Sequence, residues 1–230
     1  MRGLGTAVNV ATVLVGTAVG ILAGHRLPER IRTTLLQGAA LVVIVLGVDD
    51  AAKSRNIVFP LAALVLGGAL GEAVDIEARL ERLGERLRRR FDRAEDGSTF
   101  VEGFVAASLV FCVGPLTILG SIFDGLGRGS HELVVKAALD GIVAVVFAST
   151  LGIGVGFSAL TILVVQGGLT LTAGAADRVL TERMITEMTA VGGVMILGIG
   201  IRLLDLSPIR VASFLPALVL APVLVGLFAR

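Results

Sequence analysis

The sequence predicts an all-α fold, a polytopic transmembrane helix bundle of seven to eight spans that forms a single integral membrane domain over residues 1–230. Two observations support this fold class. Hydrophobic residues make up 55% of the chain and charged residues 17%, and the mean hydropathy is +0.92, whereas soluble domains are about 45–50% apolar and about 25% charged. The apolar residues also fall into runs of about 20, the length that a helix needs to cross roughly 30 Å of hydrocarbon.

Eight apolar runs are bounded by charged residues, proline or glycine. The first has only Arg2 ahead of it and lacks a small-residue cleavage site followed by a soluble chain. We therefore interpret it as a retained span and not as a signal peptide. The expected spans are 6–24, 33–50, 57–74, 101–123, 133–152, 155–175, 184–204 and 208–228.

The number of spans is open at the fifth and sixth runs, because only "GIGVG" at 152–156 separates them and no charge marks a turn. A single helix over 133–175 would be roughly 64 Å long, which is twice the bilayer thickness. Either the chain turns back at these glycines, or one half is a re-entrant segment buried in protein. Lys and Arg in the short loops favour an N-terminus outside the cell. The C-terminus then lies outside for eight spans and inside for seven.

One long polar stretch lies between the third and fourth runs. Ile76, Leu80, Leu83, Leu87 and Phe91 recur there at three- and four-residue spacing, which predicts the apolar face of a cytoplasmic amphipathic helix over 76–96. The stretch holds seven arginines and seven acidic residues. We expect it to lie on the inner membrane surface and to fix the topology; docking of a soluble partner is the alternative.

The sequence also contains a weak internal repeat. Residues 61–70, "LAALVLGGAL", match residues 215–224, "LPALVLAPVL", at six of ten positions, and the same offset places Gly38 on Gly192. With eight spans the two copies would have opposite orientations, as in many transporters. Chance matching between apolar segments is the competing explanation.

Ionisable and amide side chains inside the apolar runs are the candidate functional residues, because a charge at the bilayer centre costs at least about 2.5–3.5 kcal/mol. Lys136 and Asp140 are four residues apart on the fifth span, so they share a helix face and can pair. Gln166 lies in the sixth span and needs partners on neighbouring helices. For all three residues the sequence leaves two interpretations open: a structural contact, or the lining of a polar pathway.

The fourth run is interrupted by Gly114 and Pro115. Pro115 removes a backbone hydrogen bond and clashes with the carbonyl group of Phe111, which leaves backbone oxygen free within the membrane. Discontinuous helices of this kind form substrate or cation sites, although many proline kinks only shape the packing.

The first span contains Asn9 and three glycines at four-residue spacing, Gly16, Gly20 and Gly24. Small residues with this spacing predict a close helix crossing. The crossing can lie within the chain or in a homo-oligomer.

Other kinds of chemistry find no support in the sequence. Only His25 and His131 are available, both at span edges, and no His/Cys group has the spacing of a zinc or haem site. "GIGVG" is not a nucleotide loop, because no strand precedes it and no Lys-Ser or Lys-Thr follows it. We expect a protein that is not an enzyme, without catalytic residues, metal, cofactor or nucleic-acid partner, and with the lipid bilayer as its partner.

Several stretches together resemble one known family. They include "GTAVNVATVLVGTAVGILAG", "FVEGFVAASLVFCVGPLTILGSIFDGLGRGS", "KAALDGIVAVVFASTLGIGVGFSA" and "VVQGGLTLTAG". The chain is similar, over essentially its whole length, to the bacterial inner-membrane family catalogued as domain of unknown function 554. The resemblance implies a multi-pass protein of the bacterial inner membrane, with about seven spans and no settled biochemical activity. Its motifs single out, among others, Asn9, Gly114, Pro115, Lys136, Asp140, Ser149, Gln166 and Glu187.

The leading functional hypothesis from the sequence is a small transporter or channel for an inorganic cation or small polar solute. Its pathway would be built around the break at 114–115, the break at 152–156, Asp140 and Gln166. The alternative is a membrane component that transports nothing and acts on a partner or on lipid through its arginine-rich helix.

Overall fold

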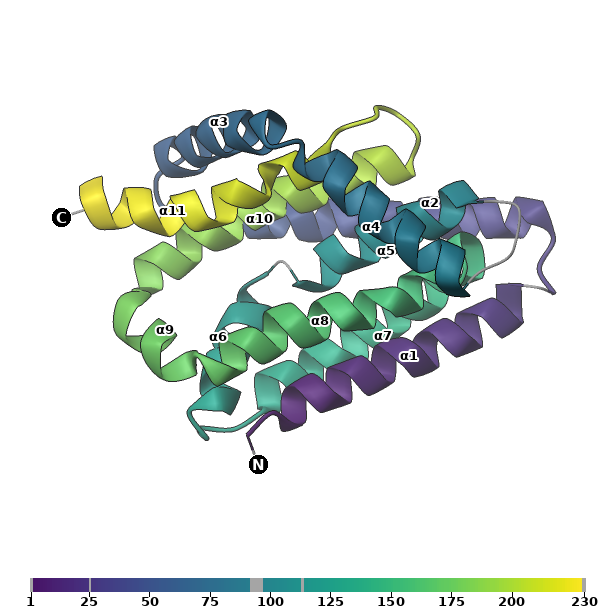
Figure 1. Ribbon diagram of the computed structural model, residues 1–230, viewed down its shortest axis with the longest axis horizontal. Coiled ribbons are helices and arrows are strands. Elements are labelled where there is room, and N and C mark those ends of the chain that lie inside the picture. Colours follow the sequence, from purple (N-terminus) through teal and green to yellow (C-terminus); the bar gives the residue numbers. More distant parts are fainter. Residues whose placement is uncertain (1, 25, 92–96, 113, 229–230) are drawn as a thin grey trace.

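The computed structural model describes residues 2–24, 26–91, 97–112 and 114–228, and every regular element within these ranges is helical. Figure 1 shows the helices packed side by side in an elongated bundle. The elements are α1 (Leu4–Gly24), α2 (Glu29–Ala51), α3 (Val58–Ala73), α4 (Ile76–Phe91), α5 (Gly97–Cys112), α6 (Pro115–Gly125), α7 (His131–Leu151), α8 (Gly154–Leu171), α9 (Ala173–Val179), α10 (Glu182–Leu203), the 3₁₀ helix η1 (Val211–Phe214) and α11 (Leu215–Phe228).

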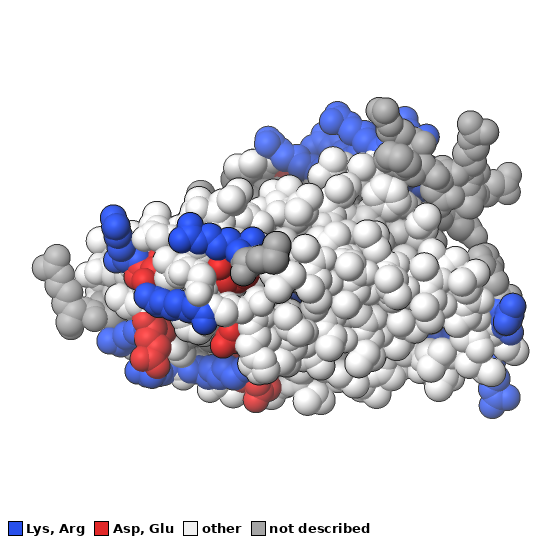
Figure 2. Space-filling view, turned by 90° about the horizontal axis from the view of Figure 1, so that it is seen from below, with Lys and Arg blue, Asp and Glu red and all other residues white. Residues whose placement is uncertain are grey.

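The bundle has the dimensions and surface of a membrane-spanning domain. Among the described residues, six helices are long and apolar enough to cross a membrane. The number rises to as many as eight if each of two bent pairs, α3 with α4 and α5 with α6, is counted as one span. Charged side chains gather toward the two ends of the molecule, and the broad face between them is almost free of charge (Figure 2). The predicted all-α, polytopic membrane bundle is confirmed.

The chain reverses direction between α7 and α8. Gly16, Gly20 and Gly24 of α1 meet Gly141, Val145 and Ser149 of α7 in the same order, so α1 and α7 are parallel. Gly156 and Gly167 of α8 meet Thr17 and Thr6 of α1 in the opposite order, so α8 is antiparallel to both.

Gly152 makes this turn at a φ of +73°, in the left-handed region that suits glycine. Because α8 runs back to the end of the bundle where α1 begins, it is a full crossing and not a re-entrant segment. The fifth and sixth runs are therefore two separate helices of opposite direction, and the described helices allow six to eight spans in all. We call the end that holds Gly24, α4 and Gly152 the inner end, and the end that holds Gly3, Asp124 and Thr170 the outer end, following the predicted topology.

A seam of glycines brings α1 and α7 into backbone contact. A Cβ atom on Gly16 or Gly20 would lie 2.3 Å from the carbonyl oxygen of Gly141 or Val145, and one on Gly24 would lie 2.5 Å from that of Ser149. No side chain fits at such distances, so the three-glycine stripe serves a helix crossing inside the chain. An oligomer would have to use another surface than Gly16, Gly20 and Gly24.

The two halves of the weak repeat lie side by side in opposite directions. In α2 and α10, Gly47 meets Gly193 while Gly200 meets Ala40, so the two helices are antiparallel. In α3 and the η1–α11 segment, Gly67 meets Ala217 while Gly71 meets Ser213, which is again an antiparallel pair. This is the arrangement that an inverted repeat requires.

Helix α4 is held to the inner end by ion pairs. It bends by 58° from α3. Glu77 is 3% exposed, and its carboxylate accepts hydrogen bonds from Arg202 Nη1 at 2.6 Å and from the backbone N–H of Ala212 at 2.8 Å. Arg210 pairs with Glu72 and, at 2.8 Å, with Asp75; hydrogen bonding to Asp75 raises the pKa of Arg210. The predicted amphipathic helix is present over Ile76–Phe91, where it packs against the inner end of the protein, and residues 92–96 of the predicted range lie outside the described residues.

Candidate functional site

Five buried polar side chains from three helices form a continuous hydrogen-bonded chain, which we call the polar chain. Asn9 Nδ2 on α1 donates to Asp140 Oδ2 on α7 and to Gln166 Oε1 on α8, each at 3.0 Å. Lys136 forms an ion pair with the same Asp140 oxygen. Gln166 Nε2 donates to Thr6 Oγ1 at 3.3 Å. The structure thus brings together Asn9, Lys136, Asp140 and Gln166, four of the residues that the sequence singled out.

The polar chain is shielded from the surroundings. Asn9 and Gln166 are fully buried, and Lys136 and Asp140 are 5% and 7% exposed. Asn9, Lys136 and Gln166 each lie five residues from the outer end of their helix, which is roughly 8 Å of helical rise, and Asp140 lies about 14 Å in. The polar chain therefore extends from near the outer end to about the middle of the bundle, and Gln166 is nearer to the middle of α8 than to its outer end.

The polar chain is not completely satisfied. Asn9 Oδ1 is buried and has no hydrogen-bond partner in the described part of the chain, and the same holds for Ser121 Oγ on α6 and Thr170 Oγ1 on α8. Buried polar atoms are normally paired with protein or ordered water. These three oxygens, on α1, α6 and α8, can therefore still form hydrogen bonds to water or to a polar solute in this part of the bundle.

The broken span lies beside the polar chain. Helix α5 ends at Cys112 and α6 begins at Pro115, with a bend of 62° between them. Gly114 has a φ of +142° and a ψ of +158°, a conformation essentially restricted to glycine. Beyond the break, Gly120 of α6 packs against Leu133 of α7, three residues before Lys136. The predicted break at Gly114 and Pro115 is present, and it lies near the ion pair.

One of the backbone carbonyls expected to be freed by the break has a partner. Thr117 Oγ1, on the first turn of α6, donates to the carbonyl oxygen of Phe111 at 3.3 Å. This hydroxyl replaces the backbone donor that Pro115 lacks. The break is therefore stabilised by its own sequence, and Phe111 does not present a bare carbonyl to a ligand.

Two crevices approach the interior from opposite ends. At the outer end, a crevice between α1 and α8 is lined by Thr6, Gly167 and Thr170, so it reaches the outermost member of the polar chain. At the inner end, a polar crevice between α4, α5 and the end of α10 is lined by Glu81, Glu102 and Arg202, with Glu85, Arg88, Val101, Asp205, Ser207 and Pro208.

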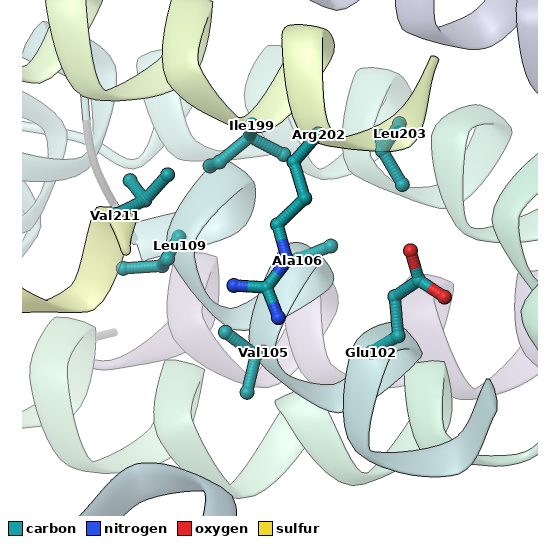
Figure 3. Close-up of a pocket in the computed structure, with 8 residues that line it drawn as sticks. All are labelled: Glu102, Val105, Ala106, Leu109, Ile199, Arg202, Leu203 and Val211. Carbon is teal, nitrogen blue, oxygen red and sulfur yellow. The ribbon is translucent and has the colours of Figure 1, made fainter. Parts of the chain in front are cut away.

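The inner crevice continues into a narrow apolar pocket of about 20 Å³ between α5 and α10, which is room for about one water molecule. Arg202 of α10 and Glu102 of α5 both line this pocket, together with apolar residues of α5 such as Val105 and Leu109 (Figure 3). Arg202 is paired with Glu77, whereas Glu102 is in no ion pair among the described residues. The pocket reaches Leu109, one turn of α5 before Cys112.

Two of the residues singled out by the sequence lie elsewhere. Glu187 is fully buried at the outer end of α10, and its carboxylate accepts hydrogen bonds from Ser54 Oγ at 2.7 Å and from the backbone N–H groups of Arg55 and Asn56 at 3.0 and 3.3 Å. It caps the turn between α2 and α3. Ser149 Oγ donates to the Val146 carbonyl at 2.7 Å within α7, at the inner end. Neither residue contacts the polar chain.

Thr6 is the member of the polar chain that the sequence analysis missed. It lies three residues before Asn9 on α1, and this spacing places both side chains on one helix face. That spacing was the available signal. Within the described ranges, no group of three or more His, Cys, Asp or Glu side chains could hold a metal ion, and the site offers hydrogen bonds and one ion pair as its chemistry.

Comparison with known proteins supports the resemblance found in the sequence. The chain matches the family model described as "Protein of unknown function (DUF554)" over residues 4–226. It is 28% identical over 225 residues to the uncharacterized membrane protein YdfK of Bacillus subtilis (strain 168), covering 96% of this chain and 95% of that protein. It is 29% identical over 221 residues to the uncharacterized protein YqgA of Escherichia coli (strain K12), covering 95% and 94%. No solved structure matches the chain.

Proposed function

The chain belongs to the DUF554 family of proteins of unknown function, and we propose that it carries a small inorganic cation or small polar solute across the membrane, as a transporter or channel. The observation that supports this proposal best is the polar chain. A buried lysine, carboxylate and two amides within membrane-spanning helices are expensive to insert. Their most common use inside membranes is in substrate, ion or proton pathways.

The composition of the polar chain suits a small hydrophilic solute. Asp140 offers negative charge to a cation, and Lys136 neutralises that charge while no cation is bound. The amides of Asn9 and Gln166 and the hydroxyl of Thr6 can donate or accept hydrogen bonds as the solute requires. A cation that binds Asp140 has to displace Lys136, so the ion pair can hold the site closed and neutral between transport events.

The positions of the two crevices are consistent with alternating access. The outer crevice touches Thr6, and the inner one ends near the turn of α5 that precedes the break. The polar chain lies between them, and its own hydrogen bonds and ion pair occupy its polar groups. A transporter built from oppositely oriented repeats opens one side at a time around such a central site, and the antiparallel pairs α2–α10 and α3–α11 provide this symmetry.

The experiment is a solute screen on purified protein reconstituted into liposomes, with current or uptake as the readout. We expect flux for at least one cation or small polar solute, and loss of that flux in Asp140→Asn and in Gln166→Ala. Asp177→Asn is a matched control, because this carboxylate is exposed at the outer end and, among the described residues, has Arg128 as its ion-pair partner. Absence of flux for every ion and solute, with protein correctly inserted, would rule out the proposal.

The second candidate function is a membrane component that transports nothing and acts through α4. The exposed arginines on this helix favour it. Substitutions on α4 would then impair the cellular role of the protein more than Asp140→Asn does. Growth or stress phenotypes of chromosomal variants, one set with substitutions on α4 and one with Asp140→Asn, distinguish the two functions.

A further inference from the structure

Charges on α4 are segregated between two faces of the helix. Glu77 and Glu81 face Arg202 of α10, at 2.6 and 3.9 Å, and Glu85 pairs with Arg89 on α4 itself at 3.7 Å. The acidic residues of the helix are therefore used in ion pairs. The balanced count of seven arginines and seven acids in the sequence conceals this separation, because it says nothing about the faces.

The opposite face presents arginines without acidic partners. Arg79, Arg82 and Arg86 are exposed, and in the described part of the chain none of them lies in an ion pair; Arg82 Nε donates to the Ala78 carbonyl of its own helix at 3.0 Å. Their spacing of three and four residues places them on one face. Leu83, at the border between this face and the apolar face of the helix, is 47% exposed, so an apolar side chain lies beside the guanidinium groups.

Helix α4 lies at the inner end of the bundle, where the predicted topology leads us to expect the headgroups of the inner leaflet. Helix α4 leads from the inner end of α3 to the inner end of α5 and crosses the bundle obliquely (Figure 1). Its other side is occupied, because Gly84 packs against Phe104 and Val101 of α5. In Figure 2, Lys and Arg side chains line one edge of the surface toward one end of the molecule.

We propose that the Arg79, Arg82, Leu83 and Arg86 face of α4 binds the headgroups of anionic phospholipids in the inner leaflet. Guanidinium groups form paired hydrogen bonds with phosphate oxygens, and a membrane surface with net negative charge attracts each basic residue near it. Leu83 can enter the boundary between headgroups and acyl chains, as apolar residues of interfacial helices do. This surface is independent of the proposed transport function, since it lies outside the polar chain.

The test uses purified full-length protein in a neutral detergent. A fluorescent short-chain phosphatidylglycerol is titrated, and the same label on phosphatidylcholine serves as the uncharged reference. We expect phosphatidylglycerol to bind at least about tenfold more tightly, because each basic residue near an anionic lipid surface adds to the attraction. The ratio of the two affinities should fall close to one in the triple variant Arg79→Gln/Arg82→Gln/Arg86→Gln. The preference for phosphatidylglycerol should also weaken as salt is raised, because the Debye length falls below about 10 Å above 0.1 M salt.

The matched control is the triple variant Arg55→Gln/Arg128→Gln/Arg178→Gln, which removes three exposed arginines at the outer end and should keep the wild-type preference. Equal affinity of the wild type for the two lipids would overturn the proposal, as would an unchanged preference in the α4 variant. Complete displacement of the lipid by soluble glycerol phosphate would also overturn it, because the face would then recognise free phosphate. If the α4 variant fails to fold, the lipid and salt comparisons on the wild type decide.

Discussion

The two most buried ion pairs among the described residues differ in what they connect. Glu77 and Arg202 join α4 to α10, and both carboxylate oxygens of Glu77 have donors. Lys136 and Asp140 lie four residues apart on a single helix, so their ion pair connects no two elements. Their links to α1 and α8 pass through Asn9, whose own Oδ1 has no partner in the described part of the chain. The Glu77–Arg202 pair therefore holds two helices together, whereas Asp140 and Asn9 keep the capacity to bind a further partner.

The largest effect is expected at the Glu77–Arg202 pair. Glu77→Gln leaves Arg202 with weaker partners and removes an acceptor from the Ala212 N–H, so we expect a loss of about 3 kcal/mol in unfolding free energy. That is the lower end of the range for breaking a buried ion pair, because the Arg202 side chain is 32% exposed. Thermal unfolding in detergent measures it. Glu81→Gln, whose carboxylate lies 3.9 Å from Arg202 and is half exposed, is the control and should change little. Equal losses in both variants would contradict the distinction.

The contact between α1 and α7 is expected to depend on glycine packing more than on the polar chain. Gly20→Ala forces a methyl group against the Val145 carbonyl, so it should destabilise the protein by about 2–3 kcal/mol as an overpacked site. Gly38→Ala on α2, where no atom lies within 4 Å of the added Cβ, should be neutral or stabilise slightly. Unfolding midpoints of the two variants provide the measurement. A harmless Gly20→Ala would mean that the polar chain itself holds α1 in place.

The break beside the Lys136 and Asp140 pair can be tested through Gly114. Alanine is strained in this backbone conformation and should cost about 1–3 kcal/mol, although no neighbouring atom obstructs the methyl group. Relief of that strain requires α5 and α6 to change their angle. We therefore expect the transport rate to fall strongly in a variant that still folds. Liposome flux and unfolding of the same preparation are compared. Loss of stability alone, with flux intact, would remove the break from the proposed pathway.

The smallest effect on stability is expected at the second ion pair. The double variant Lys136→Met/Asp140→Leu replaces both charges by apolar groups, which is often neutral or stabilising. Asn9 keeps Gln166 as an acceptor in this variant. We expect a change below about 1 kcal/mol, with flux abolished. A loss as large as that of Glu77→Gln would assign Lys136 and Asp140 a structural role.

Much of the fold followed from local sequence, whereas the partners of polar residues did not. Apolar run lengths predicted the spans, and the glycines at 152–156 and the Gly114–Pro115 step correctly located a turn and a break. The hydrogen bonds of Asn9 connect residues 131 and 157 positions apart, a separation at which helix periodicity carries no information. For the same reason Glu187 was grouped with the candidate site although it caps a turn, and the charge balance of α4 concealed its two faces.

Water access to the polar chain tests the central claim most directly. Cys112 is the only cysteine, so Cys112→Ser provides a background in which Thr6→Cys, Gln166→Cys and the core control Ala144→Cys can be labelled one at a time. A membrane-impermeant thiol reagent applied from outside should label position 6 rapidly, position 166 more slowly and position 144 not at all. If position 166 resists labelling as completely as position 144, the polar chain is dry packing and the pathway does not run through it.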